Sequence, residues 1–222
     1  MISFPWPQAN EIHIHCCALD SEVERYIAPD ERQRAERLLD PQIQSRFIAS
    51  RGLLREILGT YLGVPPQGLQ LAVQEQGKPY LSACATRLDF NLSHSGSLLL
   101  LAVAADRDVG IDLEQIRHDT PFPEMARLTF SPQEQHELFA LPDHQQRNAF
   151  YRCWTRKEAF LKACGRGFSL PSHRFDVSLL ENPTPMIAPD NHSRWLLQDI
   201  SVPDGYCAAL AAQGSAPIIR YF

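Results

Sequence analysis

Two acidic side chains lie two residues apart in the segment VGIDLE, at Asp112 and Glu114. The apolar residues around them predict a strand over residues 109–113, and side chains two apart in a strand point to the same face. Two carboxylates on one face either meet water or hold a hard cation, which prefers oxygen ligands. The spacing alone leaves both interpretations open.

Glu158 and Lys162 stand four residues apart in the segment WTRKEAFLKACGRG. The pattern predicts a helix over residues 143–164, stopped by Gly165, so the two side chains are neighbours on one helix face. An ordinary surface ion pair has the same spacing. The large apolar side chains within the segment indicate that it is partly buried, which argues against a simple surface pair.

The segment FNLSHSG, residues 90–96, predicts a strand that ends in a small polar turn with His94 at its centre. Backbone amides and hydroxyls in such a turn can face a phosphate, although a plain hairpin turn has the same composition. A serine beside a histidine also suggests nucleophilic catalysis, but adjacent residues rarely meet as nucleophile and base. The segment GKP, residues 77–79, adds Lys78 on a stiff turn.

Other charged and titratable residues gather near the start of the chain. Two predicted helices carry six arginines, which form either a solvated face or a site for an anionic ligand: Arg32, Arg34, Arg37, Arg46, Arg51 and Arg55. His13 and His15 share one face of a predicted strand. Because no third ligand is near them in the sequence, we interpret them as an exposed strand face rather than a metal pair.

The elements that must position these residues are helices and strands in both halves of the chain. One helix is expected from Pro29, and a second is capped by Asp40, begins with Pro41 and ends at Gly63. Further helices are expected over residues 122–129, 132–139 (capped by Ser131, with Glu134 three residues later) and 143–164. Strands are expected over residues 11–19, 69–73, 87–92, 98–104, 109–113, 173–180, 195–201, 206–212 and 218–221. Helices packed on a few antiparallel strands predict an α+β fold, with a junction near residues 115–123.

The composition is that of an ordinary globular chain of 222 residues with a net charge of −5, which argues against a protein that holds nucleic acid through its overall field. No apolar run is long enough for a membrane span, and the start has no secretory pattern. The six cysteines form no CxxC pair and are interpreted as reduced thiols, so we expect a cytoplasmic enzyme.

In this order and combination, the motifs resemble the Sfp-type 4′-phosphopantetheinyl transferases. The matching stretches are GKP (77–79), FNLSHS (90–95), VGIDLE (109–114) and WTRKEAFLKACGRGFSLP (154–171). The separation of Asp112 and Glu158 also agrees with the family's two-motif signature. The segments ASRGLLREILGTYLGV and IIRYF are most similar to cyanobacterial members.

The resemblance implies a monomeric pseudo-dimer of two similar α+β halves, residues 1–115 and 116–222, each with helices packed on a small, mostly antiparallel sheet. Coenzyme A is expected in the cleft between them. The implied Mg²⁺ ligands are Asp112, Glu114 and Glu158. The implied catalytic residues are Glu158, Lys162 and His94. The implied contacts to coenzyme A are Arg34, Arg46, Lys78, Pro79, Ser93, His94 and Lys162. A basic contact of some relatives falls on Glu31, which departs from the family pattern.

The implied reaction moves 4′-phosphopantetheine from coenzyme A to a serine of an apo carrier protein for fatty acid, polyketide or nonribosomal peptide synthesis, and releases 3′,5′-ADP. Glu158 is the expected base for the serine hydroxyl. Candidate contacts to the carrier are Arg127, Phe130 and the helix around residues 138–139. No nucleic acid or membrane partner is expected. Two alternatives remain: a non-catalytic module that binds coenzyme A or a carrier protein, and a Mg²⁺-dependent nucleotide hydrolase.

Overall fold

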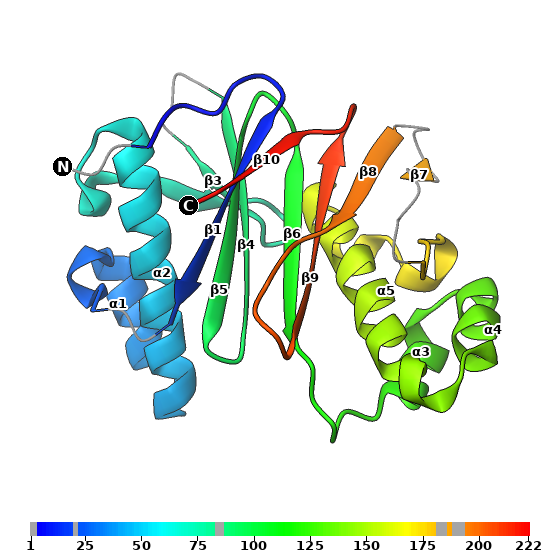
Figure 1. Ribbon diagram of the computed structural model, residues 1–222. Coiled ribbons are helices and arrows are strands. Elements are labelled where there is room, and N and C mark those ends of the chain that lie inside the picture. The colour runs from blue at the N-terminus through cyan, green and yellow to red at the C-terminus, as the bar shows by residue number, and fades with distance from the viewer. Residues whose placement is uncertain (1–3, 20–21, 83–86, 181–185, 188–193) are drawn as a thin grey trace.

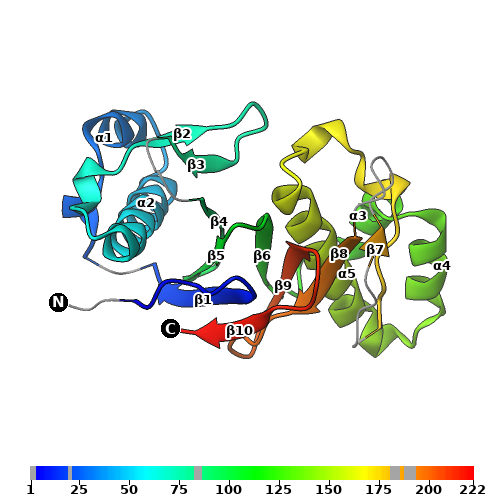
Figure 2. The same ribbon diagram turned by 90° about the horizontal axis from the view of Figure 1, so that it is seen from above.

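The protein is built in four layers, with a long helix on the outer face of each of two sheets (Figure 2). The structure is a computed structural model that describes residues 4–19, 22–82, 87–180, 186–187 and 194–222. Helix α2 (Pro41–Leu62) packs on the first sheet, and helix α5 (Asp143–Ala163) packs on the second. The two sheets share an apolar core between them.

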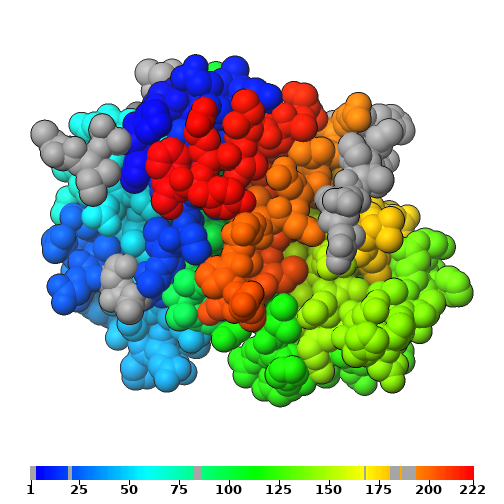
Figure 3. All heavy atoms as spheres, viewed as in Figure 1, coloured from blue at the N-terminus to red at the C-terminus, as the bar shows by residue number. Residues whose placement is uncertain are grey.

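The first sheet has the strand order β10-β1-β5-β4. Its strands are β1 (Glu11–Ala18), β4 (Leu88–Ser95), β5 (Leu98–Ala105) and β10 (Ile218–Tyr221). All neighbours are antiparallel except β10, which runs parallel to β1. The last strand of the chain therefore lies against the first, as the red and blue segments show in Figures 1 and 3.

The second sheet is antiparallel throughout, with the order β6-β9-β8-β7. Its strands are β6 (Val109–Gln115), β7 (Met186–Ile187), β8 (Arg194–Asp199) and β9 (Tyr206–Gln213). Two short strands, β2 (Leu71–Val73) and β3 (Pro79–Leu81), form a separate hairpin. The remaining helices are α1 (Pro29–Glu36), α3 (Phe122–Thr129) and α4 (Pro132–Ala140), and short 3₁₀ turns cover Glu24–Tyr26, Pro66–Gly68, Gly167–Ser169 and Ser172–Arg174.

Strand β5 explains why the two sheets stack, because its sequence LLLLAVAA is apolar on both faces. Leu99, Leu101 and Val103 face the α2 side, whereas the alternate residues from Leu100 to Ala104 enter the core between the sheets. The apolar residues of β6 enter that same central core. Its other residues, Asp112 and Glu114 among them, therefore lie on the face toward α5.

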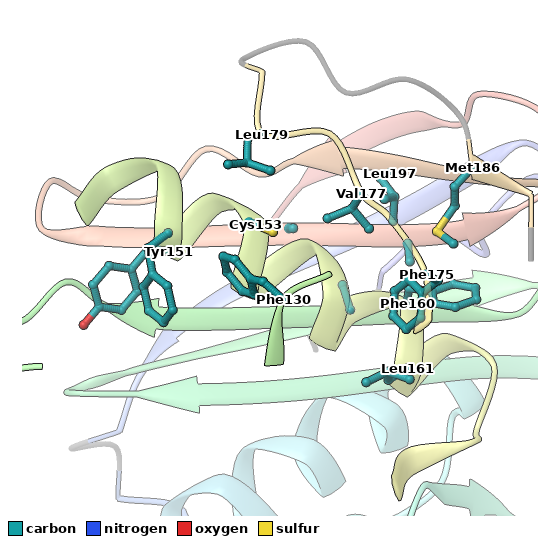
Figure 4. Packing of buried hydrophobic residues seen from close by; sticks show 14 of the residues in the cluster. Phe130, Tyr151, Cys153, Phe160, Leu161, Phe175, Val177, Leu179, Met186 and Leu197 are labelled. Atoms are coloured by element: carbon teal, nitrogen blue, oxygen red, sulfur yellow. The ribbon is translucent and has the colours of Figure 1, made fainter. Parts of the chain in front are cut away.

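The core around α5 joins the helix to β8, β9 and the segment that follows α5 (Figure 4). Phe160 meets Phe175 edge to face at 5.0 Å between ring centroids. Gly110 of β6 allows α5 to come very close, since a Cβ there would lie 2.2 Å from the Ala159 carbonyl oxygen. The glycine of VGIDLE thus brings the WTRKEAFLK helix against the acidic strand.

The predicted helix ends are confirmed by their caps. The Asp40 carboxylate accepts hydrogen bonds from the backbone N–H groups of Gln42 and Ile43, and Gly63 ends α2 in the left-handed conformation. Ser131 and Glu134 form a reciprocal capping box at the start of α4. The residues that cap each helix start therefore lie next to it in the sequence, which is why these two starts could be predicted.

Two local predictions are wrong. Ser93, His94 and Ser95 belong to strand β4, and the turn begins only at Gly96. The strand expected over residues 173–180 does not form: Ser172–Arg174 is a 3₁₀ turn, and side chains rather than a neighbouring strand bind the backbone of residues 175–180. Arg156 donates to the Ser178 and Leu180 carbonyls, and Glu134 accepts from the Val177 N–H group.

The observed fold is a mixture of helices and small sheets, as expected for the α+β class. Strand pairing crosses the expected boundary at residue 115: β6 precedes it and joins the second sheet, while β10 lies far beyond it and joins the first. The pseudo-dimer and the division into residues 1–115 and 116–222 stay predictions. Within the described ranges, no helix is long and apolar enough to cross a membrane.

Candidate active site

Asp112 lies at the centre of the candidate site, where β4, β6 and α5 meet. Its side chain is buried, and its Oδ1 atom accepts hydrogen bonds from Ser93 Oγ at 3.0 Å and Lys162 Nζ at 2.6 Å. Its Oδ2 atom is buried and has no hydrogen-bond partner among the described residues. A buried carboxylate oxygen without a partner is costly, so this atom calls for a further donor or a cation.

Helix α5 presents Trp154, Glu158 and Lys162 along one face, one turn apart, toward this cleft. The charged residues between them point elsewhere. Arg156 is fully buried and donates two hydrogen bonds of 2.7 Å to Asp199, and Lys157 forms a buried ion pair with Glu134 at 2.8 Å. The helix thus uses one face for the site and the other for the core.

The site cleft has a volume of about 440 Å³ and is lined by the predicted catalytic and metal-ligating residues together with their neighbours. The lining residues are Leu92, Ser93, His94, Asp112, Glu114, Trp154, Glu158 and Lys162. A second cavity of about 620 Å³ shares Trp154, Glu158 and Lys162 with it and extends past Lys78 and Pro79 to the segment after α5. Residues far apart in the sequence therefore form one continuous site.

The carboxyl groups in the cleft influence one another. Burial, followed by the charge of Asp112, raises the pKa of Glu158, and the nearby Lys162 opposes this rise. Burial and Asp112 also raise the pKa of Glu114, which hydrogen bonds from Ser95 and Trp154 partly offset. Both carboxyls would lose this repulsion if a cation lay between them and Asp112.

Asp112, Glu114 and Glu158 supply only oxygen atoms, the ligand type that Mg²⁺ prefers. As the side chains lie, the described part of the chain contains no group of three or more His, Cys, Asp or Glu residues close enough to hold a metal ion. Lys162 instead places its ammonium group on Asp112. The unpartnered Oδ2 atom of Asp112 and the oxygen-only donors nevertheless fit a hard cation.

His94 projects from β4 with an exposed side chain at the rim of the cleft. Partial loss of solvent around its ring, followed by the positive charges of Lys162 and Arg46, lowers its pKa. Arg46 of α2 is therefore near this rim. Arg34 of α1 is exposed and lies over the Phe47 ring at 5.4 Å.

Lys78 is more enclosed than its place on a turn suggests. Its ammonium group donates to Asp89 Oδ2 at 2.9 Å and to the Val109 carbonyl at 3.0 Å. Burial raises the pKa of Asp89, while Lys78 lowers it. Lys78 lines the larger cavity beside Pro79, but its charge is already balanced within the protein.

The six arginines of the first helices do not act as one group. Arg51 and Arg55 pair with Glu31 at 2.7 Å and 2.5 Å, and the buried Glu31 carboxylate also accepts from the Ala28 N–H at the start of α1. Glu31 and its two partners therefore connect α1 to α2. Arg32 pairs with Glu24 at 2.6 Å. Arg34, Arg37 and Arg46 therefore remain as candidates for an anion, because they make no ion pair within the described residues.

The interpretation of His13 and His15 as an exposed face is wrong. Both are buried beneath α2, and each forms a 2.8 Å hydrogen bond with the Tyr61 hydroxyl. Two of the candidate carrier contacts are also core residues, because Phe130 and Leu138 are buried. Arg127 is exposed and stacks over Phe139.

Some residues of the site were not identified from the sequence. Gly110 sets the approach of α5, Trp154 lines the cleft, and Ser95 donates to Glu114 Oε2 at 2.9 Å. The signal that could have revealed Ser95 is the alternation of polar residues along LDFNLSHS, from Asp89 to Ser95. In a strand, this alternation places them on one side.

The chain is similar to known proteins over most of its length. A family model described as "4′-phosphopantetheinyl transferase superfamily" matches residues 108–211, and one described as "4′-phosphopantetheinyl transferase, N-terminal" matches residues 20–106. The chain is 37% identical to the 4′-phosphopantetheinyl transferase HetI of Nostoc sp., over 92% of this chain and 88% of the relative. It is 32% identical to a 4′-phosphopantetheinyl transferase of Bacillus subtilis and 30% identical to the enzyme Sfp of the same species, each over 84% of this chain and 82% of the relative.

The chain therefore belongs to the 4′-phosphopantetheinyl transferase superfamily. Within it, the chain is of the Sfp type and resembles cyanobacterial members, as its motifs predict. It is an enzyme that attaches phosphopantetheine to carrier proteins, and the family uses coenzyme A as substrate.

Proposed function

We propose that this chain catalyses the Mg²⁺-dependent transfer of 4′-phosphopantetheine from coenzyme A to a serine hydroxyl of an apo carrier protein, with release of 3′,5′-ADP. The observation that carries the proposal is the meeting of Asp112 from β6 with Lys162 from α5 at 2.6 Å, in a cleft that Glu114 and Glu158 also line. The carrier belongs to fatty acid, polyketide or nonribosomal peptide synthesis.

In this proposal, Asp112, Glu114 and Glu158 hold Mg²⁺. When bound there, the ion would supply positive charge that offsets the phosphate charges an incoming hydroxyl must approach. The buried Oδ2 atom of Asp112, which has no partner in the described chain, supports Asp112 as a ligand. Ser93 and Lys162, which bind the other oxygen, keep the carboxylate oriented.

Glu158 accepts the proton of the carrier serine, directly or through a water molecule. Its place in the same cleft as Asp112 and Lys162 supports this role. Lys162 and His94 lie at the same cleft and offset charge on the phosphate groups. Attack of the hydroxyl on the β-phosphorus breaks the bond to the 3′,5′-ADP oxygen.

Coenzyme A is proposed to lie between the two halves, residues 1–115 and 116–222, in contact with residues of both. The two cavities support this placement, since they join β3 and β4 to α5. The proposed contacts are Arg34, Arg46, Lys78, Pro79, Ser93, His94 and Lys162. Arg34 and Arg46 would bind the 3′-phosphate, a role supported by their exposure and by the lack of an ion pair within the described chain.

The proposed enzyme acts as a cytoplasmic monomer and binds neither nucleic acid nor membrane. The net charge of −5 means that a small acidic carrier must dock at a local basic or apolar patch. Arg127 and the partly buried Phe139 remain candidates for this contact. The buried Phe130 and Leu138 do not.

The role of Glu158 is tested by replacing it with alanine. We expect turnover to fall by at least roughly 100-fold, the scale of lost acid–base catalysis. The measurement is the rate of mass gain of an apo carrier in the presence of coenzyme A and Mg²⁺. Asp204→Ala, which removes an exposed carboxylate in the turn between β8 and β9, is the control. A Glu158→Ala enzyme with most of its activity would remove Glu158 from the base role.

The metal assignment is tested by Asp112→Ala, for which we expect a much higher Mg²⁺ concentration for half-maximal rate. An unchanged magnesium titration would contradict Asp112 as a ligand. The same assays separate the alternatives. A binding module would leave the carrier unmodified, and a nucleotide hydrolase would release phosphate products without any carrier.

A further inference from the structure

Strands β4 and β6 face each other across the junction of the two sheets, where side chains replace the usual backbone ladder. Asp89 Oδ2 accepts from the Val109 N–H at 2.8 Å, Asn91 Oδ1 from Ile111 at 2.9 Å, and Ser95 Oγ from Gln115 at 3.0 Å. Each acceptor lies twenty residues before its donor. The alternate residues of β4 therefore follow β6 in a constant register.

The same register would pair Ser93 with the backbone N–H of residue 113. The Ser93 hydroxyl instead donates a hydrogen bond to Asp112 Oδ1. Ser95 makes both kinds of hydrogen bond, one to the backbone of β6 and one to a carboxylate of β6. It accepts from the Gln115 N–H and also donates to Glu114 Oε2 at 2.9 Å. Each of the two serines therefore binds one carboxylate of the acidic strand.

The direction of the Ser95 hydrogen bond follows from its partners. A backbone N–H can only donate, so the Gln115 amide donates its hydrogen bond to the Ser95 oxygen. An ionised carboxylate can only accept, so the hydroxyl proton points at Glu114. The two hydrogen bonds together set the orientation of the Ser95 hydroxyl, and the donated bond holds Oε2 of Glu114 in position.

We propose that Ser95 is a positioning residue that holds Glu114 in the orientation required to bind the cation. The proposal rests on the proposed function of Glu114 as a Mg²⁺ ligand. Groups that orient metal ligands through hydrogen bonds typically contribute 10- to 100-fold in metal affinity. The Trp154 indole also interacts with Glu114, so Ser95 provides one of two supports.

The test measures the dissociation constant of Mn²⁺ for the full chain with coenzyme A by electron paramagnetic resonance, without a carrier protein. Mn²⁺ takes the same oxygen ligands as Mg²⁺ and has a direct spectroscopic signal. We expect Ser95→Ala to weaken Mn²⁺ binding about 10-fold or more. Ser97→Ala is the matched control, because the Ser97 hydroxyl reaches Tyr206 rather than a carboxylate. It should bind Mn²⁺ as the wild type does.

Ser95→Thr and Ser95→Val separate positioning from packing, because the two side chains have nearly the same shape and differ in the hydroxyl. Thr should retain most of the affinity and Val should lose it, which also decides the matter if Ser95→Ala fails to fold. Equal Mn²⁺ affinities for Thr, Val and wild type would overturn the role of Ser95. A wild-type protein that transfers phosphopantetheine without any divalent cation would instead overturn the proposed metal site.

Discussion

Replacing Gly110 by alanine perturbs the contact that brings α5 to the acidic strand. A Cβ at this position would lie 2.2 Å from the Ala159 carbonyl oxygen and 2.3 Å from the Ala163 nitrogen, whereas real Cβ contacts are essentially never under 3.0 Å. Both atoms belong to the helix backbone, so no side-chain rotation relieves the clash. The helix must move away from β6 by about 1 Å.

The displacement carries Glu158 and Lys162 away from Asp112. Overpacking of a core costs about 1–3 kcal/mol, so we expect Gly110→Ala to fold with reduced stability. A misplacement of about 1 Å in a catalytic arrangement can reduce the rate about 100-fold. We therefore expect phosphopantetheine transfer to slow by about that factor, and to slow further than the loss of folded protein explains.

The assay follows the mass of an apo carrier over time at saturating coenzyme A, with the folded fraction measured by circular dichroism at the same temperature. Gly68→Ala is the control, since a Cβ there meets nothing within 4 Å and its backbone is not left-handed. It should keep normal activity. A Gly110→Ala enzyme whose rate per folded molecule stays within about threefold of wild type would refute the reasoning from helix displacement.

Two further predictions concern buried titratable residues outside the cleft. Burial lowers the pKa of His15 to about 4. Since the unfolded chain takes up this proton near pH 6.5 and the folded chain does not, stability should fall by about 2 kcal/mol between pH 7.5 and pH 5. His15→Gln should reduce that loss in urea unfolding, and an unchanged pH dependence would contradict the assignment. Lys157→Met leaves Glu134 buried without its cation and should cost about 3–5 kcal/mol of stability, partly restored by Glu134→Gln; a cost below about 1 kcal/mol would argue against the pair.

The parts of the fold that the sequence predicted depend on short-range physics. Asp40 and Ser131 carry their helix signals within four residues, and both caps form. The two-residue period of VGIDLE was enough to place Asp112 and Glu114 on one face, where the structure shows both lining one cleft. The resemblance to a known family supplied what the pattern could not, namely that α5 lies opposite this strand.

The errors arise where distant residues decide the structure. The polar run Ser93–Ser95 has the composition of a turn, but its hydroxyls bind Asp112, Glu114 and the Gln115 amide of β6 and so continue the strand. The polar side chains of His13 and His15 suggest an exposed strand face, yet the Tyr61 hydroxyl of α2 forms a hydrogen bond with each of them. No pattern within β1 could reveal a partner more than forty residues away.

The burial of Lys78 and Lys157 could not be predicted for the same reason. Lys78 is balanced by Asp89, and Lys157 by Glu134 on another helix. In the sequence, a lysine that stabilises the core and one that faces a substrate have the same appearance. Only the placement of their partners separates Lys157 from Lys162, five residues further along one helix.

The measurement that tests the central claim most directly is the intact mass of an apo carrier protein after incubation with this enzyme, coenzyme A and Mg²⁺. We expect the carrier to gain one phosphopantetheine on its serine, with no gain when a chelator removes the divalent cations or when Asp112 is replaced by alanine. A carrier that stays unmodified across a panel of fatty acid, polyketide and peptide carriers, with the enzyme folded and coenzyme A present, would contradict it.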